Sequence, residues 1–276
     1  MRNKIHNYFS QRQLGFTLVE MALVLIILGF VLGALLLPLQ AQRQQIAQSQ
    51  TENTLELAKQ ALLGFAQSNG RLPCPATVAS LGQESPLGGT DNTPANPATA
   101  NCAAQSGFLP AATLGVQPTD AEGFALDAWN NRIRYAVAAD NSSTRVPTGA
   151  TAVCGGDGAP DFTTAGNLAA VGLACLAPEL RVCNSATGIT ATNCSAAVPE
   201  VNYAINNAVA VIYSTGATGA QGSVGRPDEL ANLDGNTVFV SHDISLAAAP
   251  NEFDHMVTWI SPYVLYNSMI QAGQLH

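Results

Sequence analysis

The sequence predicts an α+β protein: a long amino-terminal helix packed on a small antiparallel β-sheet head with disulfide-stapled loops and a short carboxy-terminal helix. Three observations support this fold class. An apolar run followed by strong helix formers covers residues 16–69, short strand-like segments follow in the second half, and all six cysteines lie beyond the apolar run. We expect a leader at residues 1–15, a membrane-spanning half-helix at 16–39, an amphipathic half at 40–69 and an exported head at 70–276.

The amino terminus combines a basic leader, containing Arg2, Lys4 and Arg12, with an apolar run of membrane-spanning length. Residues 16–39 would form about 36 Å of helix at roughly 1.5 Å per residue, and a hydrocarbon core is about 30 Å thick. An ordinary secretory signal would be cleaved at small residues after the run, where LLPLQ at residues 36–40 offers no such motif. Residues 16–39 are therefore predicted to span a membrane.

Glu20 is the only ionisable side chain in this run. A carboxylate at the centre of a spanning helix costs about 2.5–3.5 kcal/mol on insertion scales, so it normally marks a partner or a function. One interpretation is that Glu20 lies near the membrane interface, where it snorkels or is protonated. The interpretation that we favour is that it pairs with a cation supplied by another subunit.

The residues from Gly15 to Glu20 (GFTLVE), with the basic leader and the apolar helix, resemble the prepilin signature of type IV pilins and type II secretion pseudopilins. In that family a membrane peptidase cuts after the glycine and methylates the new amino-terminal phenylalanine, here Phe16, and the helix then packs into a filament core. The resemblance implies that Glu20 pairs with the amino group of Phe16 on a neighbouring subunit. It also implies three partners in the membrane: other pilin or pseudopilin subunits, the prepilin peptidase and an inner-membrane assembly platform.

The charges predict the orientation of the chain in the membrane. Cleavage after Gly15 would leave eight basic and 19 acidic residues, a net charge of −11, which argues against a nucleic-acid partner. The basic leader and Arg43 behind the span predict a cytoplasmic amino terminus in the inner membrane. The head would then be periplasmic, or extracellular after assembly.

An even number of cysteines in an oxidising compartment predicts disulfides. No Cys-x-x-Cys pair occurs, which argues against zinc or thioredoxin-like chemistry. Among the 15 possible pairings we expect the sequential one, because each bond would close a loop of modest length. The expected pairs are Cys74–Cys102, Cys154–Cys175 and Cys183–Cys194.

Local signals predict the remaining elements. The second half of the long helix should bury Leu55, Ala58, Leu62 and Phe65, which recur at helical spacing, and should end at Asn69-Gly70. Pro38 should loosen the helix near the end of the span. Strands are predicted at residues 132–137, 208–213, 237–241 and 255–260, followed by a helix that starts at Ser261-Pro262 and ends before Gly273.

Parts of the head also resemble the major pseudopilin of type II secretion. The resemblance covers residues 107–135 and 208–272, including Asp127, Trp129 and Tyr135, but not residues 140–200, which look like an insertion. We expect Trp129 to be a core aromatic residue.

A calcium-binding loop of those pseudopilins has the same frame as residues 213–219 (YSTGATG), but Thr218 stands where its aspartate ligand is expected. Glu252 and Asp254 could supply the carboxylate oxygens that calcium requires. A calcium site at Glu252 and Asp254 and a metal-free loop closed by hydrogen bonds both stay open, and we favour the second. No other cofactor is expected.

The sequence offers no convincing catalytic residue. Ser241-His242-Asp243 contains the residue types of a catalytic triad, but neighbouring strand residues point to opposite faces. His242, His255 and His276 lack metal-ligand spacing, and no Walker-type loop occurs. The sequence therefore predicts a structural subunit, minor or specialised, of a type IV pilus or a type II secretion-like pseudopilus. The alternatives are a membrane-anchored adhesin or binding protein that uses the insertion, and an exported enzyme on a pilin-like anchor.

Overall fold

The computed structural model describes residues 15, 17–86, 102–139, 162–171, 176–196 and 202–275, with the backbone alone at residues 34–41 and 170–171. The leader, Phe16, Cys154, Cys175 and much of the predicted insertion lie outside these residues. The chain divides into two compact units, Met1–Ile46 and Ala47–His276, and each is treated by itself.

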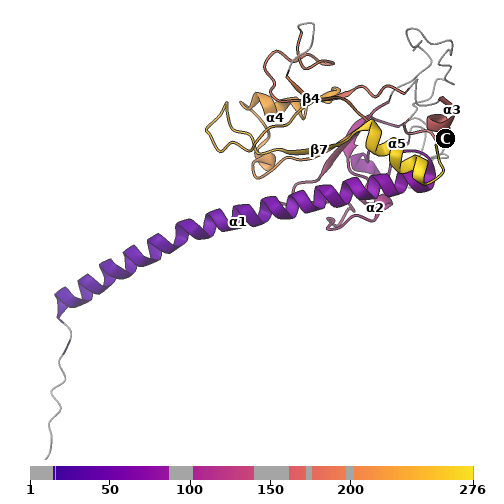
Figure 1. Cartoon of the computed structure of the whole chain (residues 1–276). Coiled ribbons are helices and arrows are strands. Elements are labelled where there is room, and N and C mark those ends of the chain that lie inside the picture. The colour runs from indigo at the N-terminus through magenta and orange to yellow at the C-terminus, as the bar shows by residue number, and fades with distance from the viewer. Residues whose placement is uncertain are drawn as a thin grey trace, which may run out of the picture. The chain divides into compact units, whose positions relative to one another are not determined.

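Helix α1 (Leu18–Asn69, indigo to purple in Figure 1) has 52 residues and confirms the predicted long helix. It ends at Asn69, and Gly70 follows with a φ of +67°, a left-handed conformation that glycine adopts without strain. Among the residues that the structure describes, none of the helices combines the length and the apolar character needed to cross a membrane. Phe16 and the side chains of residues 34–39 lie outside the described residues, so the predicted span and the loosening at Pro38 stay predictions.

In the second unit, the carboxy-terminal part of α1 buries one apolar face in the head. Leu55, Ala58 and Leu62 are buried there as predicted. The fourth buried position is Ala66, while Phe65 is only half-buried, with the Arg71 guanidinium 5.1 Å from its ring centre. Ala66 takes that place because it is four residues after Leu62, which keeps it on the buried stripe.

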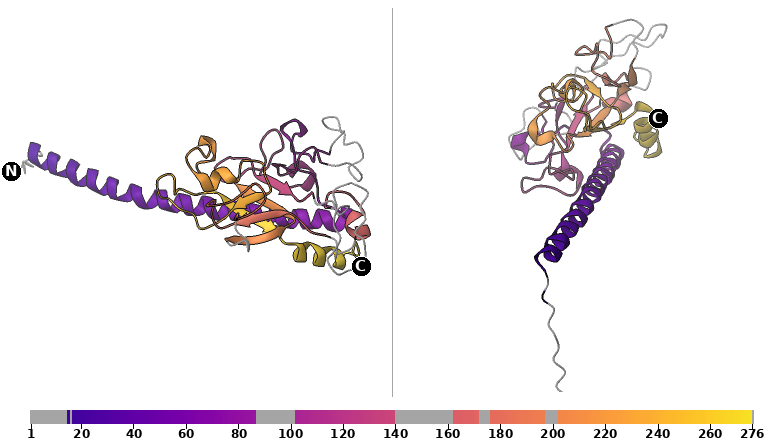
Figure 2. Two further views of the ribbon diagram at one scale, coloured as in Figure 1. Left: turned by 90° about the horizontal axis from the view of Figure 1, so that it is seen from above. Right: turned by 90° about the vertical axis from the view of Figure 1, so that its left-hand side faces the viewer.

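The first sheet contains β1 (Ser106–Phe108), β2 (Arg134–Val137), β5 (Ala210–Ser214) and β7 (Met256–Ile260). The order is β1-β2-β5-β7 and all neighbours are antiparallel, which confirms the predicted antiparallel sheet. All residues of β5 are buried, as expected for a central strand that is covered on both faces. Figure 2 shows the head from two further directions.

A second sheet was not predicted. It contains β3 (Leu180–Cys183) between β4 (Tyr203–Ala208) and β6 (Val238–Val240), and β3 pairs antiparallel with β4 but parallel with β6. Strand β3 lies inside the region expected to be an insertion, and it is the central strand of this sheet. The parallel pair is possible because β3 and β6 are joined by a long connection that includes β4 and β5.

Short helical elements complete the described part of the head. They are η1 (Val78–Ser80), α2 (Ala111–Leu114), α3 (Asn167–Val171), η3 (Gly219–Gln221), α4 (Pro227–Ala231) and α5 (Pro262–Gln271). Helix α5 starts as predicted, with the Ser261 hydroxyl accepting a hydrogen bond from the Val264 amide. It lies beside the end of α1 (Figures 1 and 2), where the side-chain amide of Gln67 donates to the Ser268 hydroxyl at 2.8 Å.

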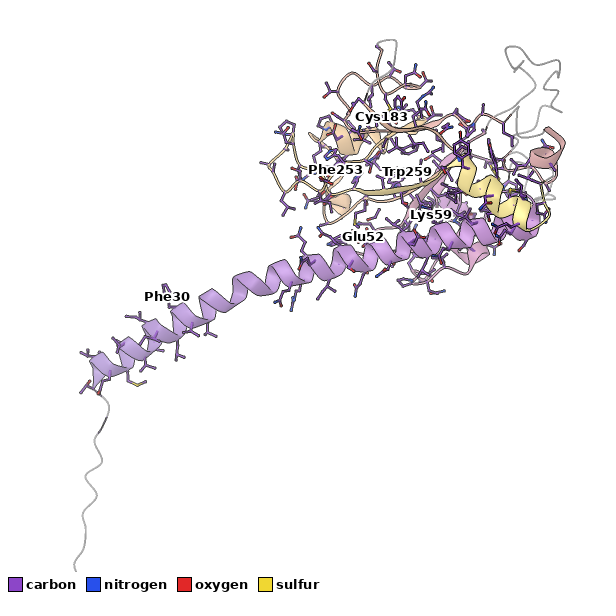
Figure 3. All side chains as sticks on the ribbon, viewed as in Figure 1. Phe30, Glu52, Lys59, Cys183, Phe253 and Trp259 are labelled. Carbon is purple, nitrogen blue, oxygen red and sulfur yellow. A yellow bond between two sulfur atoms is a disulfide. The ribbon has the colours of Figure 1, made fainter. Side chains whose placement is uncertain are left out.

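Two of the predicted disulfides are present in the described part of the chain. Cys74 is bonded to Cys102, and Cys183 is bonded to Cys194. Cys183 lies on the side of the head away from α1 (Figure 3). The pairing of Cys154 with Cys175 stays a prediction.

Candidate functional site

The start of α1 is held by a reciprocal pair of hydrogen bonds between Thr17 and Glu20. The Glu20 amide donates to the Thr17 hydroxyl at 3.3 Å, and the Thr17 amide donates to the Glu20 carboxylate at 2.9 Å. The Thr17 hydroxyl also donates to that carboxylate at 2.9 Å. Thr17 is therefore the N-cap and Glu20 the third helical residue of a capping box, which satisfies amide groups that the first turn leaves free.

This capping box places the predicted processing residues next to a defined helix start. Gly15 is exposed, and apart from its chain neighbours no described residue lies within 4 Å of the position where a β-carbon would be. Phe16 would precede the N-cap, but it lies outside the described residues. The role of Thr17 was missed by the sequence interpretation, although the Thr-x-x-Glu spacing is a recognisable capping signal.

In the head, Asp127 anchors the loop that follows β5. Its buried carboxylate accepts hydrogen bonds from the Ser214 hydroxyl at 2.6 Å and from the Asn131 amide at 2.7 Å. The Asn131 side chain in turn donates to the Gly216 carbonyl at 2.6 Å. Trp129, which we expected in the core, packs against the main core but is only half-buried.

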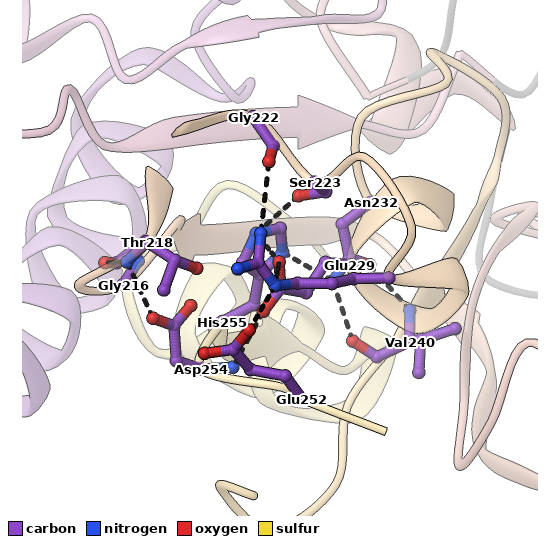
Figure 4. Close-up of polar contacts among 12 residues, drawn as sticks. Gly216, Thr218, Gly222, Ser223, Glu229, Asn232, Val240, Glu252, Asp254 and His255 are labelled. Atoms are coloured by element: carbon purple, nitrogen blue, oxygen red, sulfur yellow. Dashed lines mark hydrogen bonds and ion pairs between the residues drawn. The ribbon is translucent and has the colours of Figure 1, made fainter. Parts of the chain in front are cut away.

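The same loop is closed on its other side by Asp254. The Asp254 carboxylate accepts a hydrogen bond from the Thr218 amide at 2.7 Å (Figure 4). A β-carbon at Gly216 would lie 2.4 Å from Asp254 Oδ1, and Gly216 has a φ of +65°. Both the close approach and the left-handed conformation require glycine at this position.

Glu252, the other residue expected to bind calcium, makes a different contact. Its Oε2 atom lies 2.5 Å from Nε of Arg226, whose Nη1 donates to the Gly222 carbonyl at 3.2 Å. The ion pair therefore connects the segment before β7 to the glycine-rich loop, which covers residues 216–225. Among the residues that the structure describes, the group whose possible ligand atoms lie within 4.8 Å of one another instead consists of Glu229, Asp254 and His255.

Glu229, on α4, was not identified from the sequence. It is 1% exposed, and its Oε1 atom accepts a hydrogen bond from the Asp254 amide at 3.1 Å. Its Oε2 atom lies 3.8 Å from Arg226 Nε and 3.9 Å from His255 Nε2. Burial raises the pKa of Glu229 and also the pKa of Asp254, because water no longer stabilises either charge.

His255 is held in one tautomer by Asn232. The Asn232 side-chain oxygen Oδ1 accepts from the Val240 backbone amide at 2.7 Å. The side-chain NH₂ group of Asn232 donates to the Val240 carbonyl at 3.0 Å and lies 3.1 Å from His255 Nδ1. Nδ1 must therefore accept, which leaves the proton of the neutral ring on Nε2. Burial lowers the pKa of His255 to about 3, so the neutral ring is the relevant form. A metal ligand at Nε2 would need the opposite tautomer.

Ser241, His242 and Asp243 do not form a catalytic relay. His242 Nε2 lies 3.0 Å from an Asp228 carboxylate oxygen, and its Nδ1 lies 2.8 Å from the backbone carbonyl of Asp243. These three residues line a pocket of about 590 Å³ beside Glu52 and Glu56 of α1. The arrangement gives His242 hydrogen-bond partners other than the Ser241 hydroxyl.

Comparison with known proteins identifies the amino-terminal segment. Residues 10–36 match the model of the prokaryotic N-terminal methylation motif. No curated protein and no solved structure is similar enough to match the chain. The matched segment contains Gly15 and Glu20 and the capping box that starts α1. The chain thus carries the hallmark motif of type IV pilin-like and pseudopilin-like proteins, a structural rather than an enzymatic class.

Proposed function

We propose that this protein is a minor or specialised subunit of a type IV pilus or a type II secretion-like pseudopilus. In this proposal it is cleaved after Gly15 and methylated at Phe16. The observation that carries the proposal is the methylation motif at residues 10–36 together with a helix that starts at Leu18, just beyond the expected cleavage bond. The prepilin peptidase, other subunits and the assembly platform of the inner membrane are the proposed partners.

The capping box suggests how Glu20 acts during assembly. Before assembly its carboxylate accepts hydrogen bonds from Thr17 of its own chain. Cleavage would create an ammonium group at Phe16, and the Phe16 ammonium of a neighbouring subunit could then bind the carboxylate. In an apolar filament core an unpaired carboxylate costs several kcal/mol, so this ion pair would favour one axial register of the helices.

The head is proposed to face away from the filament axis, in the periplasm or outside the cell. The two described disulfides suit an oxidising compartment. A second sheet with its central strand in the insertion gives the head more structure than one small sheet would, which supports a specialised role.

Mass spectrometry of the amino terminus tests the proposal. We expect the membrane-extracted protein to begin at N-methylated Phe16 when a prepilin peptidase is co-expressed, and at Met1 when it is not. A chain that keeps residues 1–15 beside an active peptidase would contradict the proposal and would favour an anchored binding protein.

Substitution of Glu20 tests the assembly step separately. Glu20→Ala should abolish recovery of the protein in sheared filaments while cleavage continues, because the carboxylate is proposed to act after processing. Glu52→Ala, an exposed carboxylate of the same helix, is the matched control and should assemble normally. Assembly of the Glu20→Ala protein at the normal level would contradict the proposed ion pair.

A further inference from the structure

The residues around the loop at 216–225 do not fit the calcium ion that the resemblance to pseudopilins implies. Calcium takes six to eight oxygen ligands, but several loop carbonyls already accept hydrogen bonds. The Gly216 carbonyl accepts from the Asn131 side chain at 2.6 Å, the Thr218 carbonyl from the Gln221 amide at 2.8 Å, and the Gly222 carbonyl from Arg226. Thr218 also lacks the carboxylate expected at its position.

The carboxylates near the loop are engaged as well. Glu252 is in the close ion pair with Arg226, and Asp254 Oδ2 accepts from the Thr218 amide. Asp254 Oδ1 faces the α-carbon of Gly216 so closely that a β-carbon would lie 2.4 Å away. His255 presents an N–H rather than a lone pair to this region because Asn232 fixes its tautomer.

A cation is nevertheless present at this place in the fold. The Arg226 side chain is 12% exposed and lies between Glu252, at 2.5 Å, and Glu229, at 3.8 Å. The hydrogen bond from Arg226 to Glu252 raises the pKa of the guanidinium, so the group stays charged. Arg226 thus connects the glycine-rich loop, α4 and the segment before β7, which are three elements that a bound metal ion would also connect.

We propose that Arg226 is the resident cation of this loop and that it closes the loop without a metal ion. The guanidinium is ion-paired with Glu252, lies 3.8 Å from Glu229 and fixes the loop through the Gly222 carbonyl. Glu229 Oε2 and Asp254 Oδ1 are buried and have no hydrogen-bond partner among the described residues, and a proton held between the two carboxyl groups would lower the remaining negative charge by one. The inference does not depend on filament assembly.

The experiment is thermal unfolding of the full-length protein in detergent, followed by near-ultraviolet circular dichroism, in 2 mM CaCl₂ and in 2 mM EGTA. The wild-type midpoint should be the same in both. Arg226→Gln should lower the midpoint in EGTA by roughly 5–10 °C, because it leaves the buried Glu229 and the partly exposed Glu252 without their cation. Calcium should then raise the midpoint of Arg226→Gln, since its carboxylates have lost their competitor.

Arg132→Gln is the matched control. Arg132 also pairs with two carboxylates, Asp120 at 2.7 Å and Glu122 at 2.6 Å, but it is 28% exposed. Its substitution should change the midpoint little and create no response to calcium. If Arg226→Gln fails to fold, Arg226→Lys, which keeps the charge, should fold with a wild-type lack of calcium response.

Three results would overturn the inference. A wild-type midpoint that rises with calcium would show that a metal binds beside Arg226. An Arg226→Gln midpoint equal to the wild-type value would show that the guanidinium does not hold the loop. If Arg226→Gln lowers the midpoint but calcium does not raise it again, Arg226 forms only an ordinary ion pair and does not take the place of a metal ion.

Discussion

The two halves of helix α1 use their apolar side chains in opposite ways. In the first unit the described apolar side chains are exposed; the exposed fraction is 87% for Leu18 and 82% for Phe30. In the second unit Leu55 is 4% exposed and Leu62 is fully buried. The carboxy-terminal half is therefore completed by its own head, whereas the amino-terminal half has an apolar surface that the chain's described residues do not cover. Folding of the head and association of the amino-terminal half of α1 can therefore be tested independently.

Among the substitutions that test this difference, the largest change in stability should come from Leu62. Leu62→Ala removes a fully buried side chain from the core of the head and should lower the free energy of unfolding by about 3–4 kcal/mol. Leu25→Ala, 65% exposed in the first unit, should leave the unfolding midpoint of the head unchanged. Chemical denaturation of the full-length protein measures both. Equal effects would contradict the independence of the two halves.

The disulfide between Cys74 and Cys102 should contribute nearly as much. It joins residues separated by 28 positions and attaches the segment after α1 to the chain before β1. Replacing both cysteines by alanine should lower the free energy of unfolding by about 3 kcal/mol, because the open loop gains entropy in the unfolded chain. The measurement is denaturant unfolding without reductant. The double substitution should not change cleavage after Gly15.

Loss of the capping box should act on the first unit alone. Thr17→Ala removes the N-cap hydroxyl and should destabilise the first turn of α1 by about 1 kcal/mol. Amide hydrogen exchange should become faster at residues 18–21 and stay unchanged at residues 55–66. Thr17→Ser, which keeps a hydroxyl, is the control and should behave as the wild type. Faster exchange throughout the head would contradict a local role.

The smallest effect should be a dependence of head stability on pH. Burial raises the pKa of Glu229 and Asp254 above the ordinary carboxyl values near 4. At these two carboxyl groups the folded state therefore binds protons more tightly than the unfolded state does, whereas the buried His255 ring, whose pKa is lowered to about 3, contributes a pH dependence of the opposite sign. The stabilisation that protonation of these two carboxyl groups provides is fully present below about pH 4. It is lost as the pH rises through their raised pKa values in the folded state.

Glu229→Gln should remove the contribution of Glu229 to the dependence of the unfolding free energy on pH, because the glutamine amide cannot ionise. Urea unfolding at several pH values in EGTA measures the effect, and Glu56→Gln, an exposed carboxylate of α1, is the control. The same dependence on pH in the wild type and in Glu229→Gln would contradict the raised pKa of Glu229.

Local signals in the sequence were sufficient for several elements. Asn69-Gly70 correctly marked the end of α1, and Ser261-Pro262 marked the start of α5, because caps depend on residues within one turn of the helix ends. The strands that became β2, β5 and β7 were placed within about two residues. Strand β4 was missed because its sequence, YAINNA, has no regular alternation of apolar and polar residues, and three of its six residues are exposed.

The sequence by itself determined the features that rest on contiguous residues. These are the methylation motif, the long helix and its capping signal. The tertiary structure alone decided which side chains meet across the head. Glu229 contacts Asp254 across 25 residues, and β3 pairs parallel with β6, contacts that no local pattern encodes. Only the packed chain brings Arg226 between Glu229 and Glu252, because distant charges become neighbours only when the elements that carry them pack together.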